Sequence, residues 1–447
     1  MRIILPEKVN HIICTLQAHG FEAYAVGGCV RDSVLGREPD DWDITTSATP
    51  EETKTLFRRT FDTGIEHGTI TVLLDQDAFE VTTYRVDGKY EDSRHPSEVT
   101  FTRSLREDLL RRDFTINAMA YNDAEGLVDI FGGMADLQSK TIRCVGDARA
   151  RFGEDALRIL RAVRFAAQLG FAIEEETREG IVELAPTLEK ISAERIQVEL
   201  VKMLCSPNPA MLRTAYELGI TKVILPEFDA MMATTQENPH HCYTVGEHTL
   251  KALEFVPADK VLRLTMLLHD VAKPKMKTID EAGLAHFKKH DVEGTQMAKT
   301  ILRRLKFDND TLAKVTRLVL YHDYRMEATP RLVRRAMSKI GKDLFLEYLE
   351  VRKADALAQS DYRREEKMEN LRQIRSCYEE ILEREECVSL KDLAISGSDL
   401  IADGMESGKE VGQVLNELLL RVIENPELNK KETLLKLRRE ISAKNEM

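Results

Sequence analysis

Strand-forming patterns in this chain are confined to the residues before Arg151, and only helical periodicity follows. Ala23–Val26 is a short apolar run that ends at a glycine pair. Ile70–Leu74 and Phe79–Tyr84 are β-rich runs separated by a short polar turn, which predicts a hairpin. Beyond Arg151, apolar residues recur at spacings of three and four, as in Leu157–Ala166. The sequence therefore predicts an α+β fold, in which a mixed α/β head precedes an all-helical remainder.

The composition is that of a globular protein. Of the 447 residues, 43% are hydrophobic and 31% are charged, which excludes collagen-like, low-complexity and largely disordered chains. The formal net charge of −12 argues against a uniformly basic nucleic-acid binder. No apolar run approaches the roughly 18 residues of a membrane span, no cleavage signal follows the N-terminus, and the seven cysteines form no CxxC pair. We expect a soluble, cytoplasmic protein with free thiols and no membrane partner.

The segment Val26–Thr46 carries the strongest local signal for chemistry. Its glycine pair directly follows a strand, so backbone amides can approach a phosphate without an intervening side chain, and Arg31 adds a cation nearby. Asp41 and Asp43 follow at i and i+2, which places them on one face of an extended strand. Paired carboxylates suit hard cations of the Mg²⁺ type, as two-metal phosphoryl transfer requires. A glycine pair or an Asp-x-Asp motif alone is common in turns, and only the order of these features along the chain is specific for this chemistry.

Together with four further segments, this region resembles the class II tRNA nucleotidyltransferases, the CCA-adding enzymes of the polymerase-β-like superfamily. The further segments, in the family's order, are Phe61–Val72, Arg111–Ala120, Leu127–Gly133 and Arg151–Phe165. The resemblance implies a polymerase-β-like head in which Asp41 and Asp43 are catalytic and hold Mg²⁺. It also implies that the nucleotide is bound through its phosphates or sugar by Gly28, Arg31 and Arg112, and on its ribose side by Asp113 and Asn117.

One further acidic residue of the head lies on the second strand of the predicted hairpin. Glu80 is either a third carboxylate for the metals or an exposed strand residue.

An arginine-rich helix is expected after the head, because the apolar spacing predicts one helix through Glu154–Arg164. Asp155 and Arg158 are i, i+3 neighbours on it, and Arg161 and Arg164 continue the same ridge. Taken alone, this pattern is typical of a solvated helix face with salt bridges. The resemblance implies instead that Asp155 and Arg158 select the incoming base, and that Arg161 and Arg164 meet the triphosphate.

The hydrogen-bond donors and acceptors of Asp155 and Arg158 explain how the two side chains can select C and A. A carboxylate only accepts and a guanidinium only donates. Asp155 can therefore accept from the amino group of cytosine or adenine, while Arg158 donates to the neighbouring ring nitrogen. Uracil and guanine present a carbonyl and a protonated ring nitrogen at those positions, so each leaves unmatched buried groups at a cost of about 1–3 kcal/mol per group.

The resemblance implies transfer of CMP and AMP from CTP and ATP to the tRNA 3′ end, with release of pyrophosphate and without a nucleic-acid template. The polar stretch Tyr84–Leu110 is typical of a loop, and in this family such a loop favours full CCA addition, or A addition, over CC addition. The alternative is an A-adding enzyme or a poly(A) polymerase. The latter typically has an Arg-rich phrase where this chain has Thr63–Thr69. A non-catalytic tRNA-binding module is a further alternative.

Histidines are sparse, eleven in all, yet several follow a recognisable order in the helical half. Leu262–Asp270 is predicted to be an apolar helix that ends in a His-Asp doublet. The candidate metal ligands are His248, His269, Asp270, His290, His322 and Asp355. Imidazole nitrogens with carboxylates suit Mn²⁺, Ni²⁺, Co²⁺ or Zn²⁺, and the order resembles the HD phosphohydrolase superfamily.

This second resemblance leads to the hypothesis that the site trims a phosphate from damaged tRNA 3′ ends. Two alternatives stay open: a domain of this type kept as a scaffold, and an HD phosphohydrolase whose head only positions RNA.

Four parts are expected along the chain: a nucleotidyltransferase head (residues 1–145), a helical neck with the nucleotide-selecting helix and an RNA-binding region (146–235), an HD-type helical body (236–360) and a helical tail with a tRNA contact (361–447). Between Lys299 and Arg335, ten Lys and Arg face four Asp and Glu. This excess predicts either solvated helix faces or a surface that follows the phosphates of tRNA. DNA is not expected as a partner.

Overall fold

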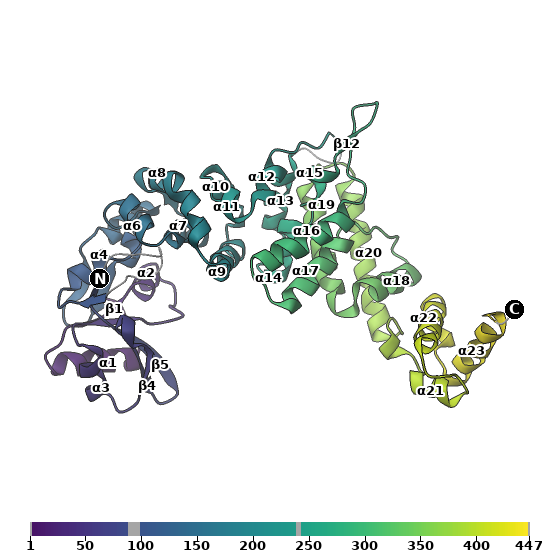
Figure 1. The fold of residues 1–447 in the computed structure, drawn as a ribbon, viewed down its shortest axis with the longest axis horizontal. Helices are drawn as coiled ribbons and strands as arrows, with labels where there is room; N and C mark the ends of the chain where they lie inside the picture. The colour runs from purple at the N-terminus through teal and green to yellow at the C-terminus, as the bar shows by residue number, and fades with distance from the viewer. Residues whose placement is uncertain (1, 88–98, 238–242, 446–447) are drawn as a thin grey trace. The chain divides into compact units, whose positions relative to one another are not determined.

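The computed structural model describes residues 2–87, 99–237 and 243–445, and the chain forms two compact units, Met1–Asp229 and Ala230–Met447 (Figure 1). The boundary falls close to the expected junction of neck and body at residue 235. The finer division into four parts stays a prediction. Residues 88–98, in the centre of the predicted Tyr84–Leu110 loop, lie outside the described residues.

The first unit is built on a seven-stranded mixed sheet with the order β3-β4-β5-β2-β1-β8-β9. Its strands are β1 (Ala23–Val26), β2 (Ile44–Thr46), β3 (Thr60–Gly64), β4 (Thr69–Leu74), β5 (Asp77–Thr83), β8 (Met119–Asn122) and β9 (Gly126–Asp129). Only β2 and β5 pair in parallel, and every other neighbouring pair of this sheet is antiparallel. The predicted hairpin is confirmed as β4–β5.

The strands β1 and β2 in the middle of the sheet are short, and all of their residues are buried. β1 consists of small and aromatic apolar residues, and β2 consists of Ile44 and two threonines. Their burial places the loops at their ends against the interior of the head. Helices surround the sheet, and a short antiparallel pair lies beside it. These elements are α1 (Glu7–Ala18), α2 (Gly28–Val34), α3 (Pro50–Leu56), α4 (Leu105–Leu110), α5 (Gly133–Ser139), the 3₁₀ turn η2 (Thr115–Asn117), β6 (Arg85–Asp87) and β7 (Val99–Phe101).

The rest of the first unit is helical, apart from β10 (Thr141–Ile142) and β11 (Ala172–Ile173), which pair in parallel. Its helices are α6 (Ala148–Glu154), α7 (Leu157–Leu169), α8 (Glu175–Leu184), α9 (Ala193–Leu204), α10 (Leu212–Glu217), α11 (Thr221–Ile224) and α12 (Pro226–Met232). The two-residue strand β11 is one of three short exceptions to the expected absence of strands beyond Arg151. The other two, β12 (Thr278–Ile279) and β13 (Ala285–His286), pair with each other in the second unit.

The single helix predicted through Glu154–Arg164 is wrong at its start. α6 ends at Glu154, α7 begins at Leu157, and Asp155 between them is extended, with φ −142° and ψ 104°. The Asp155 carboxylate accepts a hydrogen bond of 3.0 Å from the Leu157 N–H. This local bond offers the backbone an alternative to the helical pattern, which is why short acidic side chains favour helix ends.

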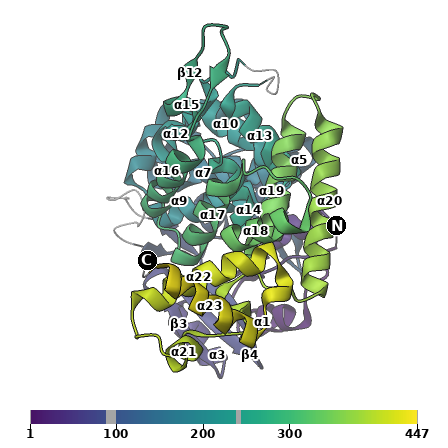
Figure 2. The same ribbon diagram turned by 90° about the vertical axis from the view of Figure 1, so that its right-hand side faces the viewer.

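The second unit is a helical assembly, and its described residues include two apolar cores, one around Phe345 and one around Leu418. Its larger helices are α13 (Val245–Phe255), α14 (Lys260–Leu268), α16 (His290–Arg304), α17 (Asn309–Tyr321), α18 (Pro330–Ile340), α19 (Phe345–Ala358), α20 (Arg364–Glu383), α22 (Lys409–Glu424) and α23 (Lys431–Asn445). The shorter ones are α15 (Lys273–Met276) and α21 (Gly397–Ala402). Within this unit, α20 runs alongside α18 and α19 (Figure 2).

Arg334 joins the two cores. Its guanidinium is 7% exposed, donates to the Ile423 carbonyl oxygen at 2.8 Å, and pairs with Glu386 at 2.7 Å. The predicted basic surface between Lys299 and Arg335 includes Arg334. Because Arg334 is buried, it cannot be part of a surface that meets RNA. The excess of basic residues in this stretch of sequence therefore overstates the positive charge at the protein surface.

Among the described residues, no helix combines the length and the apolar character that crossing a bilayer demands. The six described cysteines are free thiols, as expected. The seventh, Cys242, lies outside the described residues.

Candidate active site and metal centre

The turn after β1 is shaped by Gly27. Its φ is +84°, which L side chains rarely adopt, and a Cβ there would lie 2.8 Å from Arg112 Nη1. Gly28, the predicted nucleotide-binding glycine, begins α2, and a Cβ on it would make only an ordinary contact of 3.7 Å with Arg31. Gly27 therefore allows a close approach of Arg112 to the backbone, a role that the sequence pattern had not distinguished.

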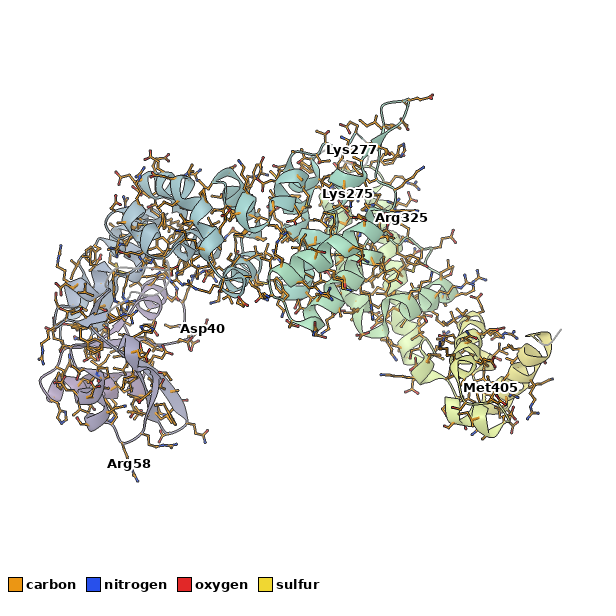
Figure 3. All side chains as sticks on the ribbon, viewed as in Figure 1. Asp40, Arg58, Lys275, Lys277, Arg325 and Met405 are labelled. Carbon is orange, nitrogen blue, oxygen red and sulfur yellow. The ribbon has the colours of Figure 1, made fainter. Side chains whose placement is uncertain are left out.

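The two predicted catalytic aspartates lie beside this turn. The Val26 N–H donates to the Asp43 carbonyl oxygen at 3.0 Å, which holds Asp43 at the point where β1 ends. Both carboxylates are exposed, and both precede β2, which begins at Ile44, so they lie in an extended loop and not on a strand as expected. Asp40, labelled in Figure 3, directly precedes them.

The electrostatics of Asp43 point to a place for a cation. Desolvation and the neighbouring Asp41 raise the pKa of the Asp43 carboxyl, while Arg112 opposes the rise. A carboxylate whose pKa is raised by burial and by a neighbouring carboxylate is in the arrangement that a divalent cation relieves. Glu80 joins them by register, because Val81 of β5 pairs in parallel with Ile44, the residue after Asp43. The donor set is thus all oxygen, which fits Mg²⁺.

Four predicted nucleotide-binding residues form one polar network. Arg31 Nη1 donates to Asn117 Oδ1 at 2.7 Å, and Asn117 Nδ2 donates to Asp113 Oδ1 at 3.2 Å. Arg161, from α7, donates to Asp113 Oδ2 at 2.7 Å. Burial would raise the pKa of Asp113, but Arg161 overrides burial and holds that pKa at about 2. The network joins α2, η2 and α7.

Arg112 occupies a different position, between Gly27 and the acidic residues. Its Nε is buried and makes no hydrogen bond within the described chain. Burial lowers the pKa of Arg112, while Asp108 and Asp43 favour its charged form. A buried guanidinium with an unused N–H beside two exposed carboxylates is suited to an anionic ligand such as a phosphate.

Asp108 holds Arg111 and Arg112 in place, and it was not among the site residues predicted from the sequence. It is fully buried, accepts from Arg111 at 2.8 Å and from the Thr45 hydroxyl at 3.1 Å, and lies 3.9 Å from Arg112. The spacing of an acidic residue three and four positions before two arginines is a signal that could have identified it.

The two predicted base-selecting residues are each held by another partner. Arg195 of α9 grips both oxygens of the Asp155 carboxylate, at 2.7 and 3.3 Å. Arg158 pairs with Glu154 at 2.6 Å and donates to the Arg111 carbonyl oxygen at 3.0 Å. Arg195 was not predicted, and only the packing of α9 on α7 brings it to Asp155.

Glu199, also on α9, is the second missed residue of the neck. It is 5% exposed, pairs with Arg164 at 2.6 Å and lies 3.8 Å from Arg161. Arg164, predicted to meet the triphosphate, is itself buried, and its guanidinium lies over the Phe165 ring. In this structure Arg164 therefore supports Arg161 through Glu199, and its contact with the nucleotide stays a prediction.

The second unit brings all six predicted metal ligands together. Two groups have ligand atoms within 4.8 Å of one another, and they share one carboxylate: His248, His269 and Asp270, and Asp270, His290 and His322. Asp355 completes the first group, with Oδ1 3.0 Å from His248 Nε2. The ligands come from α13, α16 and α19 and from the residues that end α14 and α17.

The hydrogen bonds of the histidines prepare them for a metal. In three of them Nδ1 lies 2.7–2.8 Å from a carbonyl oxygen: His269 (Met266), His290 (Phe287) and His322 (Val319). A carbonyl only accepts, so Nδ1 carries the proton and the neutral ring turns the lone pair of Nε2 inward. Facing Nε2 atoms lie 3.2 Å apart for His248 and His269, and 3.0 Å apart for His290 and His322.

Charges around the cluster favour an ionised carboxylate. Burial would raise the pKa of Asp270, but His269 and Lys273 hold it well below its usual range, and Lys273 Nζ lies 2.7 Å from Oδ2. Buried imidazole nitrogens around ionised carboxylates suit a divalent transition metal. A cavity of about 670 Å³ opens onto the cluster and is lined by Lys273, Lys288, Lys289 and Arg325, among other residues.

Comparison with known families matches three parts of the chain. Residues 23–143 match the "Poly A polymerase head domain", residues 170–232 match the "Probable RNA and SrmB- binding site of polymerase A", and residues 289–437 match the putative "tRNA nucleotidyltransferase domain 2".

Two curated relatives and one solved structure are each named as CCA-adding enzymes. The chain is 55% identical to the CCA-adding enzyme of Enterococcus faecalis over 197 residues, which is 44% of this chain and about half (48%) of that enzyme. It is 36% identical to the CCA-adding enzyme of Levilactobacillus brevis over 435 residues, 96% of each chain. The solved Bacillus stearothermophilus CCA-adding enzyme in complex with CTP is 30% identical, with a TM-score of 0.74 over 99% of both chains.

Replacing Asp113 with Asn should lower stability in a pH-dependent way. An Asp carboxyl titrates near pH 3.9 in an unfolded chain, whereas the pKa of Asp113 in the fold is about 2. Its contribution, about 2 kcal/mol, is fully present above the unfolded pKa and is lost as the pH falls through about 2. Urea denaturation followed through Trp42, the one tryptophan, should show the gap between the protein and Asp113→Asn narrowing on acidification. A gap independent of pH would contradict the Arg161–Asp113 interaction.

Proposed function

This chain belongs to the CCA-adding enzyme family, and we propose that it transfers CMP, CMP and AMP from CTP and ATP to the 3′ end of tRNA. The similarity to the Levilactobacillus brevis enzyme, which extends over nearly the whole of both chains, supports full CCA addition over A addition or polyadenylation. The observation that carries the chemistry is the convergence of Asp41, Asp43 and the Glu80 register position beside the Gly27 turn and Arg112.

The residues of the head would divide the work of the transfer. Asp41 and Asp43 would hold Mg²⁺, with Glu80 as a third carboxylate, and the ions supply activation of the 3′ hydroxyl and neutralisation of the pyrophosphate. Arg112, with its unused N–H, would bind the triphosphate. The tRNA 3′ oxygen forms a bond to the α-phosphorus, and the bond from that phosphorus to pyrophosphate breaks.

Base selection would use Asp155 and Arg158 without releasing their present partners. Each carboxylate oxygen can accept more than one hydrogen bond, and a guanidinium has five N–H donors. Asp155 can therefore accept from the amino group of cytosine or adenine while Arg195 fixes the plane of its carboxylate. Arg158 can donate to the ring nitrogen while Glu154 orients it.

Replacing Asp43 with Asn should abolish nucleotide addition. Loss of one charge-stabilising group in a transition state typically lowers kcat by about 10²–10³-fold, and loss of a metal ligand should cost at least as much. The measurement supplies tRNAs lacking three, two or one terminal nucleotides with radiolabelled CTP or ATP. Extension of all three substrates identifies CCA addition, extension of only the last identifies A addition, and long A tracts identify a poly(A) polymerase.

The matched control for that experiment is Asp40→Asn, which makes the same change in the neighbouring exposed residue. It should keep most of the activity. An Asp43→Asn enzyme that still releases pyrophosphate would refute the catalytic assignment, and a native chain that releases none from any NTP would leave only tRNA binding.

Replacing Asp155 with Ala should impair CTP and ATP incorporation and reduce discrimination against UTP and GTP. One mismatched buried group is worth about 1–3 kcal/mol, so we expect a loss of roughly 5- to 150-fold in selectivity. A four-NTP extension assay measures it, with tRNA binding as the control, which should not change. Unaltered selectivity would contradict the base-selecting role.

We further propose that the His and Asp cluster of the second unit hydrolyses a phosphate ester at damaged tRNA 3′ ends and thereby frees the 3′ hydroxyl for nucleotide addition. The support is the buried, tautomer-fixed histidine set and the cavity above it, whose lining includes Lys288, Lys289 and Arg325. The chain would hold Mn²⁺, Ni²⁺, Co²⁺ or Zn²⁺, which supplies an activated water when bound. Lys288, Lys289 and Arg325 would bind the phosphate, and water would replace the ester oxygen on phosphorus.

His269→Ala should lose bound metal and the release of phosphate from RNA ending in a 3′-phosphate, while CCA addition to intact tRNA continues. His19→Ala, an exposed histidine in α1's C-terminal turn, is the control. Metal content by mass spectrometry and phosphate release are both measured. A metal-loaded His269→Ala protein with full hydrolysis would refute the proposal.

A further inference from the structure

A second cavity also borders Asp355 of the His and Asp cluster. It encloses about 570 Å³ and is lined by residues of α19 and α20 and of the segment between α17 and α18. It shares four lining residues with the cavity that opens onto the cluster: Asp323, Arg325, Asp355 and Gln359. Arg325, labelled in Figure 3, thus faces both cavities. A ligand whose phosphate reaches the cluster therefore lies next to residues that also line the second cavity.

Gln359 connects the cluster to this second cavity through its side-chain amide. Its Nε2 donates to Asp355 Oδ2 at 2.9 Å, and its Oε1 accepts from Lys367 Nζ at 2.8 Å. One amide group and two hydrogen bonds therefore separate a metal-binding carboxylate from an ammonium group. A nucleotide that carries phosphates at its 3′ and 5′ positions likewise presents two charged groups on one small unit, its ribose.

The cations of the second cavity differ in the partners that they meet. The cavity is lined by four cations and five carboxylates, which are Arg325, Arg352, Arg363 and Lys367, and Asp323, Glu327, Asp355, Glu366 and Glu369. Arg363 pairs with Glu366 at 2.5 Å and Arg325 with Asp323 at 3.0 Å. Lys367, by contrast, is half-buried and donates to the neutral Gln359 oxygen.

Arg352 is similar. Its Nη1 donates to the carbonyl oxygens of Tyr324 and His322, at 3.3 and 3.4 Å, with Asp323 3.8 Å away. Its Nε is buried and makes no hydrogen bond within the described residues. A half-buried lysine on a neutral acceptor and an arginine with an unused N–H provide donors for an anion.

We propose that the second cavity binds the 5′-phosphate of the nucleotide whose 3′-phosphate lies at the metal cluster, with Lys367 as the principal contact and Arg352 in support. This inference rests on the proposed phosphohydrolase and deepens it. In RNA, that 5′-phosphate is the diester linking the last nucleotide to the preceding one. The site is therefore selective for the end of an RNA chain over a nucleoside that carries only a 3′-phosphate.

The test compares two ligands that differ only in the group at issue. Adenosine 3′,5′-bisphosphate and adenosine 3′-monophosphate are titrated by calorimetry into the full-length chain without added metal, so that binding is read without hydrolysis. We expect the bisphosphate to bind at least about tenfold more tightly, the order of effect of a charge-assisted hydrogen bond. With metal added, the same preference should appear in the KM for phosphate release from the 3′ position.

Lys367→Met should reduce the preference for the bisphosphate to within about twofold, since the charge is lost while the aliphatic stem is kept. Lys353→Met is the matched control, because Lys353 is an exposed lysine of α19 outside the second cavity, 3.6 Å from Glu350. The comparison of the two variants also separates this site from nucleotide binding in the head, which neither change touches.

The outcomes separate the two proposals. Equal binding of the two ligands, or a preference that survives in Lys367→Met, overturns the 5′-phosphate subsite even if the enzyme hydrolyses both ligands. A preference lost only in Lys367→Met supports the subsite. If that preference is present but neither ligand releases phosphate with any of the four metals, the subsite stands and the hydrolysis proposal fails.

Discussion

The pairing of Asp113 with Arg161 is the interaction on which the organisation of the first unit depends. Asp113 is buried in the head, and its carboxylate would be costly there without compensation. It accepts from the Phe114 N–H at 2.8 Å, from Asn117 and from Arg161 of α7. Asn117 in turn accepts from Arg31 at the glycine turn. One ionised carboxylate thus orients the turn, the η2 segment and α7 relative to one another, and these are the elements that carry the proposed nucleotide contacts.

The two candidate metal sites differ in the way that their proposed ions require. The carboxylates of the head are exposed oxygen ligands, which suit Mg²⁺ because that ion keeps several waters and shares its coordination with substrate phosphates. The cluster of the second unit is buried and rich in nitrogen, and its rings are fixed by carbonyl acceptors, so it can hold a less strongly hydrated transition metal in defined geometry. Each site lies within one unit.

Arginine illustrates the limit of sequence reasoning for this chain. Arg112, Arg164 and Arg334 are alike in the sequence, yet their environments differ. Arg112 keeps an unused N–H beside the carboxylates that we propose to be catalytic, Arg164 is buried against Glu199, and Arg334 joins two apolar cores. A guanidinium can bind a ligand, hold a neighbouring side chain in place or join two parts of the fold, because all three roles use the same N–H donors. The residues that determine which role each arginine has lie tens of positions away in the sequence.

The features that depend on local order could be predicted from the amino-acid sequence. These include the strand before the glycine pair, the β4–β5 hairpin, the change to helices and the order of the six candidate His and Asp ligands, because propensity, turn residues and spacing are local properties. Other features became visible in the folded chain alone: Asp155 breaks its helix and meets Arg195, Glu199 supports Arg161, and two cavities share Asp355 and Gln359. Those contacts join separate helices, and their geometry is set by packing, which no local pattern encodes.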